Sequence, residues 1–282
     1  MIKIVTDTTC DLPPAWVEEY DITRVPINIQ FGTENYHEGV DIDLDLFYQK
    51  IEELGIIPTT SQPSVGEFAE VYRRLAREEG VDTIISVHVT GKLSGTYQSA
   101  SMATQEVADE VKVYPYDSLA GSTALGFMCV EASRMAGAGK SPEEIIARLD
   151  EIRSRINVIL TLDTLEYSRK SGRVGGLSAA VASLLNVKPI VNLEDGLLDV
   201  MEKVRTRKKS LNRLLDIVEE RVGTTTPINL GVLHARVFEV GEEMLSRTEE
   251  RFNCQETYVA DLCASLTVQF GPGTVGMCFY EV

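Results

Sequence analysis

The chain has 282 residues, of which 44% are hydrophobic and 25% are charged, and its formal net charge is -16. This length allows one large α/β unit or two modest domains, either of which can bury a core. The acidic balance argues against nucleic acid and anionic membranes as main partners, and no apolar run has the length of a stable membrane insertion.

The first residues, "MIKIVTDTTCD", predict a strand rather than the charged and apolar segments of a signal peptide, so we expect no export. The five cysteines are scattered and form no CxxC pair or histidine-ligand pattern. We therefore expect a cytoplasmic protein whose cysteines are reduced core residues, with no metal and no cofactor.

The first half of the chain alternates strand and helix patterns. A strand at 2–7 precedes a helix that opens near Pro13 or Pro14, and a buried strand within 81–89 precedes a helical pattern from about Gly95. A third strand within 111–117 precedes apolar residues at helical spacing within 118–136. This alternation predicts right-handed βαβ crossovers and a mainly parallel sheet.

The second half has a different pattern. A strand and a helix within 157–176 are followed by two extended runs around Asp195 and Gly196, which predict a hairpin. A helix over 208–222, a strand over 228–235, another helix and two late strands around 270–274 complete the chain. We expect a second α/β domain with a mixed, largely antiparallel sheet, and we place the domains at 1–155 and 156–282.

The segment "GAGKSPEE" (137–144) resembles the end of a phosphate-binding P-loop. That motif needs a glycine five positions before Gly139, where this chain has Arg134. The segment instead predicts a helix end followed by a new helix, with Ser141 as N-cap and Glu144 completing a capping box.

Hydroxyl side chains precede two predicted helices. Ser64 and Glu67 have capping-box spacing, which places Thr60 and Ser61 just before a helix N-terminus that favours anions. Ser94 follows the buried strand within 81–89 in the same way.

Three strand-to-helix turns, at 6–11, 90–96 and 116–123, should gather at the carboxyl edge of the parallel sheet, where ligands bind in such folds. Serine, threonine, aspartate and glycine also simply form good turns and caps. If these turns instead form a ligand site, their neutral hydroxyl donors suit a carboxylate.

Ser94 is also a candidate nucleophile, but no GxSxG elbow is present, and His37, His88 and His234 offer no evident base. His88 lies inside an apolar strand, where a hydrogen-bonded core histidine is the expected role.

The alternating aspartates of 41–45 lack the glycine and the distal glutamate of a calcium loop, so a solvated edge or a helix-start cluster is predicted there.

The motifs occur in the order found in one family. The chain resembles, over essentially its whole length, the DegV family of bacterial fatty-acid-binding proteins. The resemblance rests on "VTDTTCDLP", "PTTSQPS", "GKLSGTYQSA", "DSLAGSTALG", "YSRKSGRVGG", "VKPIVNLEDGLL", "KVRTRKK" and "FGPGTVG".

The resemblance implies a two-domain α/β protein that binds one long-chain fatty acid, such as palmitate or oleate, between its domains. It also implies a role as the acyl-binding subunit of a fatty acid kinase: a carrier without catalysis of its own, which presents the carboxylate to a separate ATP-dependent kinase. The carboxylate-binding positions fall on Thr60 and Ser94. We also expect Ser61 and Gln269 to bind the carboxylate, and we take Gly95 and Ser118 as candidate head-group or partner contacts.

One position departs from the family pattern. Members of the family have a histidine two positions before the GPG turn, and this chain has Gln269. Glutamine donates a hydrogen bond to a carboxylate but cannot titrate or carry positive charge. We therefore expect binding to tolerate the change better than kinase coupling does.

Basic residues concentrate in one stretch of this acidic chain, between Arg169 and Arg213. Arg173, Arg205 and Arg207 are candidate contacts for an acidic kinase or for a phosphoryl group. For Lys208 and Lys209, a solvated helix start with caps and ion pairs is the alternative. The apolar segment "LSAAVASLL" (177–185) is either a wall of the acyl tunnel or ordinary core.

Three hypotheses follow. The first is a fatty-acid-binding protein with Thr60 and Ser94 in its head-group site. The second is an acyl-transferring or hydrolysing enzyme that uses Ser94. The third is a regulatory or scaffold protein with a merely structural lipid.

Overall fold

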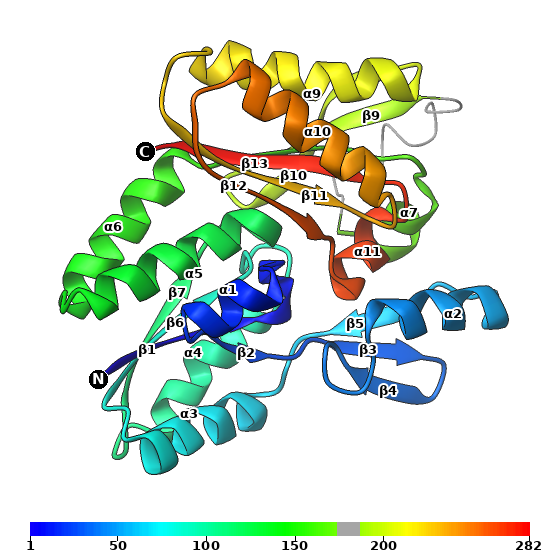
Figure 1. The fold of residues 1–282 in the computed structure, drawn as a ribbon. Helices are drawn as coiled ribbons and strands as arrows, with labels where there is room; N and C mark the ends of the chain where they lie inside the picture. Colours follow the sequence, from blue (N-terminus) through cyan, green and yellow to red (C-terminus); the bar gives the residue numbers. More distant parts are fainter. Residues whose placement is uncertain (174–186) are drawn as a thin grey trace. The chain divides into compact units, whose positions relative to one another are not determined.

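The computed structural model describes residues 1–173 and 187–282, and the chain divides into two compact units (Figure 1). Unit 1 comprises 1–121 and 125–154, and unit 2 comprises 122–124 and 155–282. The main division therefore falls between Ser154 and Arg155, and a three-residue segment, 122–124, groups with the C-terminal unit.

Unit 1 contains a four-stranded sheet in the order β2-β1-β6-β7, in which every neighbouring pair is parallel. The strands are β1 (Ile2–Asp7), β2 (Thr23–Val25), β6 (Thr83–His88) and β7 (Lys112–Asp117). The helices that connect and cover them are η1 (Thr8–Cys10), α1 (Pro14–Glu19), α3 (Val65–Glu79), α4 (Thr96–Glu106), α5 (Ser122–Gly137) and α6 (Pro142–Arg155). The predicted parallel α/β architecture is confirmed for this part of the chain.

One apolar core of unit 1 lies between this sheet and the helices α3 and α4. Phe68, Tyr72 and Leu75 recur at helical spacing along α3 and are fully buried. They pack with Val5 of β1 and Ile84 of β6 in one apolar cluster. Burial of these side chains fixes how α3 lies on the sheet.

A second, three-stranded sheet in unit 1 was not predicted. Its order is β4-β3-β5, and both pairs are antiparallel. Its strands are β3 (Asn28–Phe31), β4 (Glu34–His37) and β5 (Thr59–Ser61), and α2 (Leu44–Leu54) lies between β4 and β5 in the chain. Asp43 caps α2 by accepting from the Leu46 amide, which confirms the helix-start interpretation of 41–45.

The helix start that resembled a P-loop is a capping box. Ser141 N donates to Glu144 Oε2 at 2.9 Å, and Glu144 N donates to Ser141 Oγ at 3.2 Å. Pro142 is the first residue of α6. The backbone donors that a P-loop would offer to phosphate are therefore used within the protein.

The described residues of unit 2 form a six-stranded sheet in the order β10-β9-β8-β13-β11-β12, and among these strands only β11 and β12 pair in parallel. The strands are β8 (Asn157–Thr161), β9 (Lys188–Glu194), β10 (Leu197–Val204), β11 (Ile228–His234), β12 (Cys254–Asp261) and β13 (Val275–Glu281). The mixed, largely antiparallel sheet is confirmed. Asp195 and Gly196 turn the predicted hairpin with φ of 48° and 75°, the positive values that such tight turns require.

The helices of unit 2 are α7 (Glu166–Ser171), α9 (Arg207–Val222), α10 (Phe238–Arg251) and α11 (Ala264–Phe270). The two late strands predicted around 270–274 are β12 and β13, but the residues directly before that turn form the helix α11, which was not predicted. The segment 264–270 alternates apolar and polar residues as a half-buried strand would, but six of its seven residues are buried, on both sides of that alternation, and the segment forms a helix.

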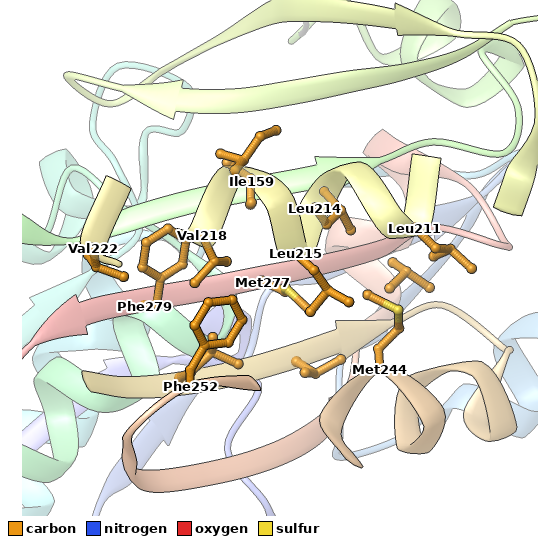
Figure 2. Close-up of a cluster of buried hydrophobic side chains, with 14 of the residues drawn as sticks. Ile159, Leu211, Leu214, Leu215, Val218, Val222, Met244, Phe252, Met277 and Phe279 are labelled. Carbon is orange, nitrogen blue, oxygen red and sulfur yellow. The ribbon is translucent and has the colours of Figure 1, made fainter. Parts of the chain in front are cut away.

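The core of unit 2 forms where α9 and α10 cover the sheet (Figure 2). Leu214 and Val218 of α9 are fully buried and pack with Ile159 of β8 and with Met277 and Phe279 of β13.

Residues 122–124 group with unit 2 and contact its sheet at two places. A Cβ on Gly231 of β11 would lie 2.6 Å from the Cβ of Thr123, so only glycine leaves room there. Tyr258 of β12 also donates from its hydroxyl to the Thr123 carbonyl at 3.1 Å.

Candidate functional site

Hydrogen bonds connect the turns that follow the carboxyl ends of the parallel strands in unit 1. Asp7, the last residue of β1, accepts from Val89 N at 3.1 Å, just beyond β6. Asp117, the last residue of β7, accepts from Gly91 N at 3.0 Å. Thr90 N donates to the Ala120 carbonyl at 2.9 Å. The three predicted turns therefore do gather at one sheet edge.

Ser94 lies in the turn between β6 and α4 and is half-buried. Its amide donates to the Thr90 carbonyl at 3.2 Å, and its Oγ accepts from Thr96 N at 3.2 Å. The Oγ also lies 2.8 Å from Thr96 Oγ1. These contacts hold the hydroxyl at the start of α4, which suits the binding of an anion better than nucleophilic attack, because none of them supplies a base.

Thr60 and Ser61 precede α3 as predicted, but they lie in a strand rather than in a loop. They belong to β5, where Thr60 pairs with Ile29 and Ser61 with Asn28 of β3. Thr60 is half-buried and Ser61 is exposed. The strand fixes the backbone of the hydroxyl pair more firmly than a loop would.

The capping box that begins α3 is also present. Ser64 N donates to Glu67 Oε2 at 2.7 Å, and Glu67 N donates to Ser64 Oγ at 3.2 Å. The helix end therefore satisfies two of its own donors, and the hydroxyls of β5 lie on the residues that lead into it.

The two hydroxyl segments meet at Gly95. A Cβ at this position would lie 2.9 Å from Cδ and 2.9 Å from Nε2 of Gln62, the residue that follows β5. The Asn28 side chain donates to the main-chain carbonyl of Gln62 at 3.4 Å, and this bond helps to fix Gln62. The end of β5 and the turn that carries Ser94 are thus in direct contact, with Gly95 allowing the close approach.

Ser118 has a local role in this arrangement. It is fully buried, its Oγ accepts from Ala120 N at 3.0 Å, and its hydroxyl lies 3.2 Å from the Ala120 carbonyl. Its hydroxyl is therefore engaged in shaping the β7–α5 turn.

Gln269 lies in unit 2, in the last turn of α11, and is buried. Ser168 of α7 donates to its main-chain carbonyl at 2.9 Å. This bond ties α11 to α7 and fixes the backbone from which the Gln269 side chain extends.

The three arginines selected from the sequence have different environments in unit 2. Arg173 is exposed and donates to the Ser171 carbonyl at 2.7 Å, and Arg205 is exposed between β10 and α9. Arg207 is half-buried at the first position of α9, and its Nη1 is buried without a hydrogen-bond partner among the residues that the structure describes. Burial lowers the pKa of the Arg207 guanidinium from its ordinary value, an effect that Asp163 partly opposes.

Thr206 caps α9 by accepting from Lys209 N at 3.3 Å. In the described parts of the chain, no acidic side chain lies within ion-pair distance of Arg205, Lys208 or Lys209. The predicted cap is therefore present, whereas the ion pairs considered for these lysines are not found among those residues. The segment 177–185, considered as a tunnel wall, lies outside the described residues.

A buried polar group next to the candidate site was only partly foreseen. His88 is fully buried and hydrogen-bonded to Asp7 and Ser86, which confirms it as a core histidine. One of the two partners, Ser86, could have been found from the sequence, because the i, i+2 spacing of Ser86 and His88 puts both side chains on one face of a strand. The long-range partner Asp7 had no such signal.

No group of three or more histidine, cysteine or acidic side chains within 1–173 and 187–282 is arranged to hold a metal ion. None of the helices found there has both the length and the apolar character required to span a bilayer.

Comparison with known proteins gives a consistent result over the whole chain. Residues 1–282 match the family model described as "Uncharacterised protein, DegV family". A DegV domain-containing protein of Halalkalibacterium halodurans is 34% identical over 279 residues, which is 99% of this chain and 98% of that protein.

Two solved structures share the fold. DegV of Bacillus subtilis, described as a fatty acid binding protein, has a TM-score of 0.91 and 31% identity, with 100% of this chain and 99% of that chain covered. A stearic acid-binding protein of Eubacterium ventriosum has a TM-score of 0.89 and 25% identity, with coverage of 100% and 98%. Family model, sequence and fold agree from end to end, and the chain belongs to the DegV family.

Proposed function

We propose that this protein binds one long-chain fatty acid and holds the carboxylate with the hydroxyls of Thr60 and Ser94. The observation that carries the proposal is the contact of Gln62 with Gly95, which joins the two hydroxyl segments in unit 1. Further support comes from the relatives in Bacillus subtilis and Eubacterium ventriosum, which are described as binding fatty acid.

The chemistry of the two segments fits a carboxylate. Hydroxyls donate hydrogen bonds without adding charge, and the N-terminus of α4 behind Ser94 contributes a partial positive charge. Ser61 and Gln269 are additional donors in this proposal. Because Gln269 cannot titrate, its contribution to binding stays the same across the physiological pH range.

The acyl chain supplies most of the affinity. Burying about sixteen methylenes at roughly 0.8 kcal/mol each contributes on the order of ten kcal/mol. The hydroxyls then mainly orient the acid group. This division of roles explains how a site without a buried lysine or arginine beside the carboxylate can still bind an acid tightly.

We further propose that the bound acid is presented to a separate ATP-dependent fatty acid kinase and is not transformed by this protein alone. The exposed Arg205 and its neighbours Lys208 and Lys209 support this, because they form a basic surface on an acidic protein. Such a surface attracts an acidic partner or the phosphoryl group that the kinase transfers.

The test of binding combines extraction and titration. Protein purified under native conditions is extracted with organic solvent, the extract is analysed by mass spectrometry, and delipidated protein is titrated with palmitate and oleate. We expect a co-purified fatty acid, and a loss of about tenfold or more in palmitate affinity for Thr60→Val and for Ser94→Ala, because each removes a hydrogen bond to a charged group worth roughly 1.5–3 kcal/mol.

Thr59→Val is the matched control. Thr59 is exposed on the same strand, and its side chain points to the opposite face from that of Thr60. An empty wild-type protein that also ignores both acids would contradict the proposal. Turnover of an activated ester by the wild type that is lost in Ser94→Ala would favour the enzyme hypothesis instead.

A further inference from the structure

Four buried polar side chains form a continuous chain of hydrogen bonds in unit 1. Tyr72 Oη of α3 lies 2.7 Å from Ser86 Oγ, and Ser86 Oγ lies 2.6 Å from His88 Nε2. His88 Nδ1 lies 3.0 Å from Oδ2 of Asp7. All four side chains are 0% exposed, and the ring of Phe68 packs edge-on against His88.

The direction of these bonds follows from the groups that meet at Asp7. Its Oδ1 accepts from Thr9 N at 3.0 Å and from Thr9 Oγ1 at 2.5 Å, and its Oδ2 accepts from Val89 N at 3.1 Å as well as from His88. A carboxylate that receives four donors has no proton of its own to give. His88 therefore carries a proton on Nδ1 and donates it to Asp7.

The other end of the chain decides the state of His88 Nε2. If Nε2 also carried a proton, it would donate to Ser86, and Ser86 would donate to Tyr72. The hydroxyl proton of Tyr72 would then be buried without an acceptor among the described residues, which is costly. If Nε2 is an acceptor, Tyr72 donates to Ser86, Ser86 to His88 and His88 to Asp7, and every group is satisfied.

The residue types are those of a hydrolase triad, but the position excludes that use. Ser86 Oγ is fully buried and is already bonded to Tyr72, so no substrate reaches it. The chain of bonds instead ends where the backbone of the Ser94 turn begins. Asp7 holds Val89 N, the next residue bonds to Ala120, and Ser94 N bonds back to Thr90.

We infer that Tyr72, Ser86, His88 and Asp7 form a one-directional hydrogen-bond chain that fixes the β6–α4 turn, so that Asp7 and His88 are positioning residues for Ser94. The effect on fatty-acid binding rests on the function proposed above. The effect on the turn does not, because it is a property of unit 1 alone.

The sharpest variant is Asp7→Asn. This variant keeps the size of the side chain but replaces one oxygen with an NH2 group, which is a donor. Because each Asp7 oxygen accepts from two donors, the NH2 group lies against two donors in either orientation of the amide. We expect amide hydrogen exchange at Val89 and Thr90 to accelerate at least tenfold, and palmitate affinity to fall at least tenfold with Thr60 and Ser94 intact.

The matched control is Thr6→Val, which is isosteric, fully buried and on the opposite face of β1 from Asp7. It should leave both readouts unchanged. A second pair of variants tests the donor itself: His88→Asn keeps an N–H near the Nδ1 position and should retain more of both readouts than His88→Leu. Equal behaviour of the two His88 variants would overturn the inference.

Two measurements separate the inference from the proposed function. The ¹⁵N chemical shifts of His88 in the wild type should show a protonated Nδ1 and an unprotonated Nε2, and a protonated Nε2 would overturn the inference even if Asp7→Asn failed to fold. If the wild type binds palmitate and Asp7→Asn binds it equally well, the inference fails and the function stands. If the wild type binds no fatty acid, the function fails, and accelerated exchange at Val89 in Asp7→Asn still supports the positioning role.

Discussion

Asp7 illustrates what a fully buried carboxylate requires. Burial alone would raise the pKa of the Asp7 carboxyl, but hydrogen bonds from His88, Thr9 and Val89 more than offset this, and the pKa is lowered from its ordinary value. The charged form is therefore the one that the fold stabilises. Removing a hydrogen-bond acceptor here leaves buried donors without partners.

This predicts a pH dependence of stability with a defined sign. A carboxyl whose pKa is lower in the folded state contributes stability that is present above its unfolded pKa of about 3.9 and is lost as the pH falls through the lower folded value. We expect the free energy of unfolding to decrease more steeply below about pH 4 for the wild type than for Asp7→Asn. Urea unfolding at a series of pH values measures both slopes, and parallel slopes would contradict the prediction.

At the scale of elements, the candidate site depends on how a short strand is joined to a helix. β5 has only three residues, and two residues separate it from the Ser64 cap of α3. The register of β5 on β3 and the capping box therefore hold the Thr60 segment from both sides. In the proposed site, neither the β5–β3 pairing nor the capping box contacts the fatty acid itself.

The two capping boxes of the chain allow a matched comparison. We expect Ser64→Ala and Ser141→Ala each to lower the free energy of unfolding by about 1 kcal/mol, because each removes the same bond to a helix N-terminus. Only Ser64→Ala should weaken palmitate binding, by a few-fold, because only its helix follows the Thr60 strand. Urea unfolding and palmitate titration of both variants test this, and an equal effect on affinity would show that the cap acts through stability alone.

At the scale of the whole molecule, the positive charges are concentrated in one stretch of a chain whose net charge is negative. Acidic residues outnumber basic ones by 43 to 27, yet basic residues concentrate between 169 and 213. Some of these are neutralised, such as Arg213 by Glu202 at 2.6 Å and Lys188 by Asp163 at 2.7 Å. Arg205 is exposed and has no acidic partner among the described residues, so its positive charge is available to attract a molecule in solution.

Reversing that charge should affect partner recognition and not lipid content. We expect Arg205→Glu to reduce acyl-phosphate formation by an added ATP-dependent fatty acid kinase about tenfold or more at low salt, with a smaller loss at high salt. Arg24→Glu, which makes the same charge change at an exposed position in unit 1, is the control. If Arg205→Glu instead loses its bound fatty acid, the basic surface has a structural role.

The sequence alone determined the parts of this protein that depend on local chemistry. Alternating strand and helix patterns gave the parallel sheet of unit 1, the Asp195–Gly196 pair gave the hairpin of unit 2, and serine–glutamate spacing gave both capping boxes, because each depends on neighbouring residues only. The strands β3, β4 and β5 and the helix α11 were missed. The three strands have only three or four residues each, and the alternation within 264–270 is typical of a strand, so packing rather than the local pattern decided these conformations.

Only the tertiary structure decided which distant groups meet. The contact of Gln62 with Gly95, the space that Gly231 leaves for Thr123, and the bond between His88 and Asp7 each join residues from separate elements. No local spacing encodes such pairs, because a strand or helix pattern specifies which face a side chain occupies and not which segment will cover it. The hydroxyls of the candidate site were visible in the sequence, but the groups that hold them in place became visible only in the folded chain.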